Sequence, residues 1–342
     1  MNKTILPPKL WKKPVDLDLE RMTHPWYRAL VRLENTISVE TMLFYHKAGL
    51  VTMHLPVTTG SISSPMGQGS DSLPVQIDLF GVPTYLADSM QFMLEYGCRL
   101  HSKGCYYLMP SFRGEAADSR HLCQFYHSEA EIPGDLEAGI TLVEQYLRHL
   151  CTVLLRDRHT DNQACAGTTE HLTDFLSRKA IPRVTMDQAV AFLSLQPSET
   201  HLYQVDPKYG FRTITPTGEQ HLIRHYKGFV WLTHFDHLSV PFYQAFDQHP
   251  SKAKNADLLF GIGEVVGAGQ RHVTHEDVRY ALSLHKVSGD SYRWYTRMKE
   301  LAPMQTSGFG MGIERFLLWV LNHDDIRDCQ LLPRYNGVEC LP

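Results

Sequence analysis

Arg113, Glu115 and Phe125 lie in a stretch, SFRGEAADSRHLCQFYHSEAEI, whose pattern is that of two strands joined by a turn. Two residues apart on a strand, Arg113 and Glu115 would share one face, and Phe125 would lie on the returning strand. An arginine can hold a phosphate with its forked donors while an aromatic ring stacks on a base. The stretch could therefore bind a nucleotide, although by itself it favours a surface ion pair beside a core phenylalanine.

Asp257 and Glu264 could supply a metal site in the segment ADLLFGIGEVVGAGQR. They are seven residues apart, on one strand or on either side of a bulge, and carboxylate oxygens are preferred ligands of Mg²⁺. Gly267 and Gly269 would let a ligand approach the backbone, and Arg271 projects from the same segment. Without other motifs, the segment favours two solvated acids and an ion-paired arginine.

Glycine occupies every second position at the start of SGFGMGIERFLLWVL. Gly308, Gly310 and Gly312 would leave one face of a strand bare, and Arg315 follows where a helix should begin. Neither this stretch nor GIGEVVG completes the GxGxxG pattern of dinucleotide-binding folds. The sequence also contains no Walker A motif and no HExxH motif.

Hydrophobic periodicity predicts one helix, then strands in hairpins, with further helices added. This order predicts an α+β fold with a largely antiparallel sheet. We expect residues 1–24 to be an irregular leader, 25–342 to form one domain, 59–73 to be a loop and 157–180 a surface insertion. The expected helices are 24–49, 91–104, 136–156, 184–195 and 275–302; the expected strands are 50–57, two within 75–89, 105–115, 122–132, 228–235, 256–272 and 306–312.

Composition is that of a globular protein: 342 residues, 43% of them hydrophobic and 20% charged. The net charge of −4 gives no basic field to recruit nucleic acid. Seven cysteines, an odd number without a CxxC pair, favour reduced thiols over a disulfide framework or a zinc site. No signal peptide and no apolar run of membrane-spanning length is present, so we expect a cytoplasmic protein without a membrane partner.

Taken together, and in their order along the chain, the motifs described above resemble those of the catalytic domain of class II aminoacyl-tRNA synthetases, closest to the asparaginyl/aspartyl branch. The hairpin SFRGE…RHLCQF resembles the family's arginine-plus-acid hairpin, GFGMGIER its GxGxGxxR signature, and DLLFGIGEVVGAGQR its Asp…Glu…Gly…Gly…Arg pattern. YLADSMQFMLE, PFY and IRDCQLLPR also fit the branch. The first helix followed by Pro56 resembles the family's dimer motif, which implies a homodimer. The match covers roughly residues 25–338.

The resemblance implies ATP and Mg²⁺ as cofactors and a reaction in which a carboxylate attacks the α-phosphorus and releases pyrophosphate. Arg113 and Arg315 would be catalytic, holding the α- and γ-phosphates, while Asp257 and Glu264 would bind Mg²⁺. The further ATP contacts that it implies are Glu115, His121, Phe125, Glu264 and Gly312, and the amino-acid contacts are Ser89, Gln91, Gly267 and Arg271.

The sequence departs from a tRNA-charging enzyme of this branch at three points. Only about 24 residues precede the first catalytic helix, where those enzymes have an anticodon-binding domain; the hairpin loop is one residue shorter; and Gln124 replaces a usual glutamate. Leu94 replaces the lysine that pairs with the β-carboxylate in aspartyl enzymes, so which carboxylate is activated stays open.

The segment SSPMGQGSDSLPVQIDLFG resembles stand-alone archaeal asparagine synthetases related to asparaginyl-tRNA synthetase. We therefore expect an ATP-dependent, AMP-forming amide ligase that activates aspartate or a close analogue and transfers it to ammonia or a small amine. On this interpretation tRNA is not a partner. Two alternatives stay open: a truncated asparaginyl-tRNA synthetase that acylates tRNA, and a non-catalytic dimeric paralogue.

Overall fold

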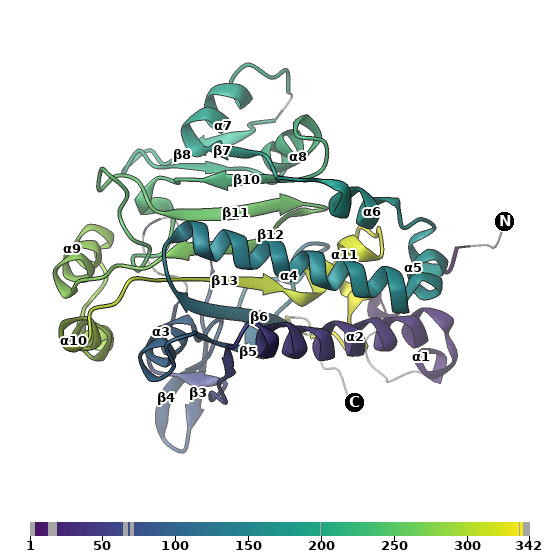
Figure 1. Cartoon of the computed structure of the whole chain (residues 1–342), viewed down its shortest axis with the longest axis horizontal. Coiled ribbons are helices and arrows are strands. Elements are labelled where there is room, and N and C mark those ends of the chain that lie inside the picture. The colour runs from purple at the N-terminus through teal and green to yellow at the C-terminus, as the bar shows by residue number, and fades with distance from the viewer. Residues whose placement is uncertain are drawn as a thin grey trace.

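An eight-stranded sheet forms the centre of the protein, with long helices across one face and further helices around its edges (Figure 1). The computed structural model describes residues 4–12, 19–63, 68, 72–198, 200–334 and 336–337, and part of the expected loop 59–73 lies outside them. The six inner strands pair antiparallel, and the two edge pairs, β1–β5 and β7–β10, are parallel. In sheet order the strands are β1 (Val51–Thr52), β5 (Cys105–Phe112), β6 (Gln124–Pro133), β13 (Thr306–Gly312), β12 (Gly263–Gln270), β11 (Asn255–Phe260), β10 (Val230–Thr233) and β7 (Arg183–Thr185). The α+β prediction is confirmed.

Local sequence signals account for the long helices. Pro25 occupies the first position of α2, and the Asp135 carboxylate caps α4 by accepting from the Ala138 N–H at 3.0 Å.

Within the described residues, no helix has both the length and the apolar character needed to cross a membrane. The α-helices are α1 (Leu19–Thr23), α2 (Pro25–Lys47), α3 (Gln91–Leu100), α4 (Leu136–Asp157), α5 (His159–Ala166), α6 (Glu170–Ser177), α7 (Met186–Leu193), α8 (Pro216–His225), α9 (His275–His285), α10 (Arg293–Leu301) and α11 (Ile313–Val320); 3₁₀ turns span Leu10–Lys12, His237–Ser239, Asp290–Tyr292 and Ile326–Cys329.

The two faces of the sheet differ because side chains alternate along each strand. Phe309 and Met311 of β13 point into the main core beneath α4, which lies across this face (Figure 1). Val266 and Ala268 of β12 join the same core. The alternate positions, including Gly267 and the glycines of β13, therefore face the other side of the sheet, where the cavity lies.

Residues 157–180 do not form the surface insertion that the sequence led us to expect. They fold into α5 and α6, and Cys165, Leu172 and Phe175 are buried in the main core. The centres of the Phe175 and Phe229 rings are 5.1 Å apart, and the Arg148 guanidinium lies 5.4 Å from the centre of the Phe175 ring. The segment looked polar because it buries only about one apolar side chain per turn.

The described part of the leader is also attached to the domain. Ile5 donates its N–H to the Ala164 carbonyl at 2.8 Å, and the Trp11 indole donates to Asp328 at 2.8 Å.

The strand expected at 50–57 is reduced to β1. A small second sheet holds β2 (Thr58–Thr59), β4 (Val82–Leu86) and β3 (Val75–Leu79). The turn between β3 and β4, the two strands expected within 75–89, falls at Phe80 and Gly81, both with positive φ.

The hairpin of β8 (Tyr203–Val205) and β9 (Arg212–Ile214) was not predicted. Arg212 fixes it to the domain, because its Nε donates to Asp236 at 2.7 Å and its Nη2 to Asp187. Lys252 contacts both acids, at 2.8 Å and 2.7 Å. This four-charge cluster holds the hairpin against the open face of the sheet.

Candidate active site

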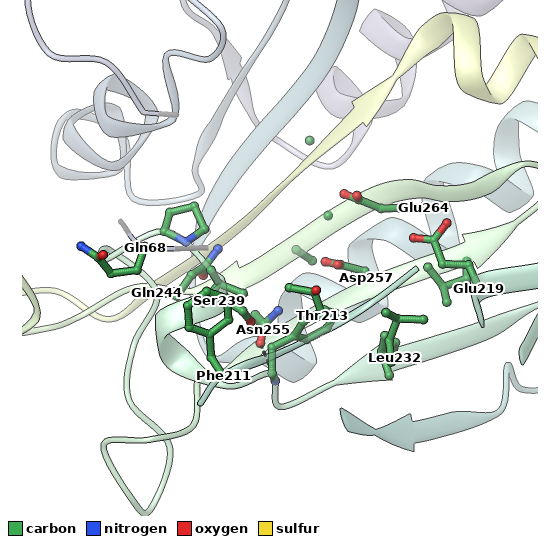
Figure 2. A pocket seen from close by; sticks show the side chains of 18 of the residues that line it. Gln68, Phe211, Thr213, Glu219, Leu232, Ser239, Gln244, Asn255, Asp257 and Glu264 are labelled. Carbon is green, nitrogen blue, oxygen red and sulfur yellow. Dashed lines mark hydrogen bonds between the residues drawn. The ribbon is translucent and has the colours of Figure 1, made fainter. Parts of the chain in front are cut away.

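A cavity of about 890 Å³ opens on the glycine-rich face of the sheet. Figure 2 shows Asp257, Glu264 and Glu219 at one end and Gln68 and Gln244 at the other. The structure brings seven of the residues singled out from the sequence to this one cavity: Ser89, Gln91, Arg113, Asp257, Glu264, Gly267 and Arg271. Five others are not part of its lining: Glu115, His121, Phe125, Gly312 and Arg315.

Asp257 and Glu264 lie on two paired strands, whereas the sequence predicted either one strand or the two sides of a bulge. β11 and β12 form a hairpin in which Asp257 is opposite Gly267, with a register irregularity between Leu258 and Leu259. A Cβ at Gly267 would stand 2.9 Å from Glu264 Oε1 and 3.6 Å from Asp257 Oδ1, so the glycine leaves room between the two carboxylates. Burial and the nearby carboxylate of Glu264 raise the pKa of Asp257 well above its ordinary value. A divalent cation would relieve this repulsion, so the donor set fits Mg²⁺.

Arg315 reaches this acidic end from the first turn of α11. Its Nη1 donates to the Glu264 carbonyl oxygen at 2.7 Å and lies 3.9 Å from the Glu264 carboxylate. Burial lowers the pKa of Arg315, and the positive charge of Arg113 acts in the same direction. Two arginines that disfavour each other's charge are suited to an anionic ligand between them, as a polyphosphate would be.

Arg113 and Glu115 follow the end of β5 at Phe112, so they do not share a strand face as predicted. The backbone pairing continues as far as Arg113, whose N–H donates to the Cys123 carbonyl at 2.9 Å. The Arg113 guanidinium lies 5.6 Å from the centre of the Phe125 ring. Among the described residues, Arg113 Nε and Glu115 Oε2 are buried without a hydrogen-bond partner. Of the two residues, Arg113 lines the cavity and Glu115 does not.

His121 is placed differently from what the resemblance implies. Its ring lies on the outer side of the hairpin loop, exposed, with Nδ1 3.0 Å from Asp118 Oδ1. Asp118 also accepts from the N–H groups of Arg120 and His121 at 2.7 Å and 2.8 Å. In this conformation of the loop, the side chain serves an Asp118-centred turn rather than the cavity.

Glu129 is a site residue that the sequence analysis missed. It lines the cavity from β6 and accepts from the Ser89 hydroxyl at 2.7 Å and from the Tyr107 hydroxyl. The His127 ring contacts its other oxygen at 3.0 Å. The sequence did contain a signal for Glu129. In SEAEI, Glu129 and Glu131 flank an alanine in a strand that is otherwise apolar enough to be buried, and buried carboxylates are rare without binding partners.

Gln91 and Arg271, expected to contact the amino acid, are both bound to the buried carboxylate of Glu131. Gln91 Nε2 donates to Glu131, and Arg271 Nη2 lies 3.2 Å from the same oxygen. Arg271 is 3% exposed and still lines the cavity. A Cβ at Gly308 would overlap the Gln91 and Glu131 side chains. Gly308 therefore makes room for this internal network and not for ATP, whereas Gly310 does line the cavity.

The unpredicted β8–β9 hairpin and the segments beside it supply one wall of the cavity. Its lining side chains include Gln204, Asp206, Phe211 and Thr213. The Asp206 carboxylate turns the loop by accepting from the N–H groups of Lys208 and Tyr209, at 2.9 Å and 2.6 Å. No sequence motif marked this wall.

Asp88 should give the protein a pH-dependent stability. Burial raises the pKa of Asp88 from 3.8 to about 6, and the nearby Arg113 opposes this rise. Between these pH values the folded state retains a proton that the unfolded chain has lost, so stability falls as the pH rises through this window. We expect Asp88→Asn to gain about 3 kcal/mol over the wild type between about pH 4 and about pH 7.5 in urea unfolding.

The exposed Asp157→Asn is the matched control and should show no such gain. A stability difference between Asp88→Asn and the wild type that does not change with pH would contradict the expected titration.

Both the sequence and the fold are similar to those of known proteins. Residues 16–336 match the family model described as tRNA synthetases class II (D, K and N). An asparagine–tRNA ligase of Thermoplasma acidophilum is 24% identical over 321 residues, covering 91% of this chain and 71% of that protein. The corresponding ligase of Pelotomaculum thermopropionicum is 28% identical over 338 residues, covering 96% and 75%. The solved asparaginyl-tRNA synthetase from Pyrococcus horikoshii, complexed with asparaginyl-adenylate, aligns with a TM-score of 0.83 at 22% identity, covering 94% and 72%.

Proposed function

Because the chain belongs to the class II tRNA synthetase family (D, K and N), we propose that it activates an amino acid with ATP as an acyl-adenylate. The observation that supports this most directly is the single cavity that joins Arg113, Asp257 and Glu264 to Ser89, Glu129 and Arg271. The first group suits a metal-bound polyphosphate, and the second suits an ammonium group and a polar side chain. The reacting carboxylate and the α-phosphate would meet between them.

The chain's own residues would act by positioning and by charge. Arg113, held over Phe125 at 5.6 Å, would stabilise the negative charge that develops on the α-phosphate. Arg315 would neutralise the far end of the polyphosphate. Mg²⁺ bound by Asp257 and Glu264 would draw charge from the phosphates. Glu129, already an acceptor for Ser89, is suited to the substrate ammonium.

The substrate end favours a neutral side chain on the amino acid. Glu131 already matches the charge of Arg271, at 3.2 Å in a fully buried position. A substrate carboxylate placed there would be a buried charge without a partner of its own. We therefore propose asparagine in preference to the aspartate expected from the sequence, in agreement with the asparagine ligases to which the chain is similar.

We propose tRNA as the acceptor of the acyl group, because the two relatives named above, from Thermoplasma acidophilum and Pelotomaculum thermopropionicum, are asparagine–tRNA ligases. The transfer to ammonia or a small amine that the sequence led us to expect becomes the competing outcome of the test. The homodimer and the cytoplasmic location remain predictions.

The test has two steps, each with the full chain, ATP and Mg²⁺. Pyrophosphate exchange with each amino acid in turn identifies the activated substrate, and we expect asparagine. Total tRNA or ammonium is then added, and acylated tRNA or a new amide is measured. Acylation of tRNA supports the proposal, whereas an amide product without acylated tRNA favours the small-amine ligase. No exchange with any amino acid would favour the non-catalytic alternative.

A further inference from the structure

Gln244 lies at the substrate end of the cavity, in a position that no motif marked. It follows the 3₁₀ turn His237–Ser239 and forms an isolated bridge with Arg271. Its side chain lies flat on Gly269, because a Cβ there would overlap Oε1 and come within 2.8 Å of Nε2. Figure 2 shows Gln244 at the end of the cavity opposite Glu264. The glycine of β12 thus makes room for this one amide.

The orientation of the Gln244 amide follows from its partner. Arg271 Nη1 lies 3.0 Å from the side-chain oxygen Oε1. A guanidinium can only donate, so the oxygen of the amide must face Arg271 and the NH₂ group must point the other way. Among the residues that the structure describes, Nε2 has no hydrogen-bond acceptor. The half-buried side chain therefore offers an N–H donor to the cavity.

The backbone of Gln244 is fixed from behind by two buried histidines. His237 Nε2 lies 2.8 Å from the Gln244 carbonyl oxygen, and its Nδ1 lies 2.9 Å from His285 Nε2. Because a carbonyl only accepts, His237 Nε2 carries the hydrogen, and its Nδ1 accepts from His285. Burial lowers the pKa of His237 to about 4, so this arrangement persists at neutral pH. The donor is held in place before substrate arrives, which limits the entropy lost on binding.

Arg271 and Gln244 together determine which substrate side chains can bind at this end of the cavity. The Arg271 charge is matched by Glu131, and one of its donors is used by Gln244. Gln244 adds a neutral donor beside this matched pair, on the side that faces the cavity. A neutral donor pairs well with a neutral carbonyl, and it cannot balance the charge of a carboxylate.

We infer that Gln244 is a specificity-determining residue that donates its side-chain N–H to a neutral side-chain carbonyl of the activated amino acid. The inference rests on the proposed adenylation. It goes further by naming the group that is read, a primary amide rather than a carboxylate, and the side chain that reads it.

The test compares asparagine and aspartate in pyrophosphate exchange, with the full chain, ATP and Mg²⁺. For Gln244→Met, which keeps length and removes the donor, we expect the KM for asparagine to rise about tenfold while the KM for ATP is unchanged. The ratio of kcat/KM for asparagine to that for aspartate should fall by a similar factor. Gln244→Glu keeps the shape and replaces the donor by an acceptor, so its asparagine KM should rise at least as much.

Gln163→Met is the matched control, because Gln163 lies on α5 outside the cavity and binds the Gly167 carbonyl at 2.6 Å. It should behave as the wild type. Thermal unfolding of each variant shows whether the fold is retained, and the nearly isosteric Gln244→Glu provides a second measurement if Gln244→Met unfolds.

Two results would overturn the role of Gln244 and leave adenylation in place. One is an asparagine-to-aspartate ratio unchanged in both folded variants. The other is a wild type that activates only amino acids without a side-chain amide. A wild type that exchanges pyrophosphate with no amino acid would instead overturn the proposed function, and this inference with it.

Discussion

Replacing Arg113 with alanine is expected to lower the rate of amino-acid-dependent pyrophosphate exchange by about 10²–10³-fold, the effect of removing one preorganised donor from a developing negative charge. Arg113 lines the cavity, and its Nε is buried without a partner among the described residues, so the folded protein holds a donor that it does not use itself. The loss should fall mainly on kcat, because the added interaction forms in the transition state.

Arg113→Lys separates charge from geometry. It keeps the cation but removes the forked donors and the planar group over Phe125, so we expect an intermediate rate. Arg156→Ala, at an exposed ion pair with Asp157, is the matched control and should retain wild-type exchange. Exchange within threefold of the wild type in folded Arg113→Ala would remove Arg113 from the site.

Replacing Lys299 with methionine is expected to lower the free energy of unfolding by about 3–5 kcal/mol. Lys299 and Glu95 form an ion pair in which both side chains are 0% exposed, and Lys299 also donates to the His272 carbonyl at 2.7 Å. The variant leaves the Glu95 carboxylate buried, with the Tyr295 hydroxyl as a donor at 2.7 Å. Urea unfolding at neutral pH measures the loss.

Removing both charges should recover most of this stability. In Glu95→Gln/Lys299→Met the Gln oxygen can still accept from Tyr295, and no buried charge remains. The exposed Lys103→Met should lie within about 0.5 kcal/mol of the wild type. If the double variant is as unstable as Lys299→Met, the cost comes from lost packing or from the His272 contact and not from an unpaired carboxylate.

The sequence predicted the fold class and most strands because their signals are local. Alternation along Thr306–Gly312 marks one bare face and one core face, and the structure has Phe309 in the core and Gly310 at the cavity. The same alternation failed to separate β11 from β12, because the run 258–263, LLFGIG, crosses their turn without a polar residue. The β8–β9 hairpin was missed because its strands are three residues long and its stability comes from the distant Asp236 and Lys252.

The sequence alone determined which residue types are present for binding and catalysis. These are two arginines, two acids and the glycines, in an order specific enough to identify a family. Residue type and spacing carry this information, because each motif is a short segment with its own backbone requirement. Only the tertiary structure decided which of these side chains are free to meet a substrate. Glu131 and Arg271, 140 residues apart, satisfy each other, and Gln244 is left with a donor facing the cavity. Pairing between distant segments depends on how strands and loops pack, and no local pattern records it.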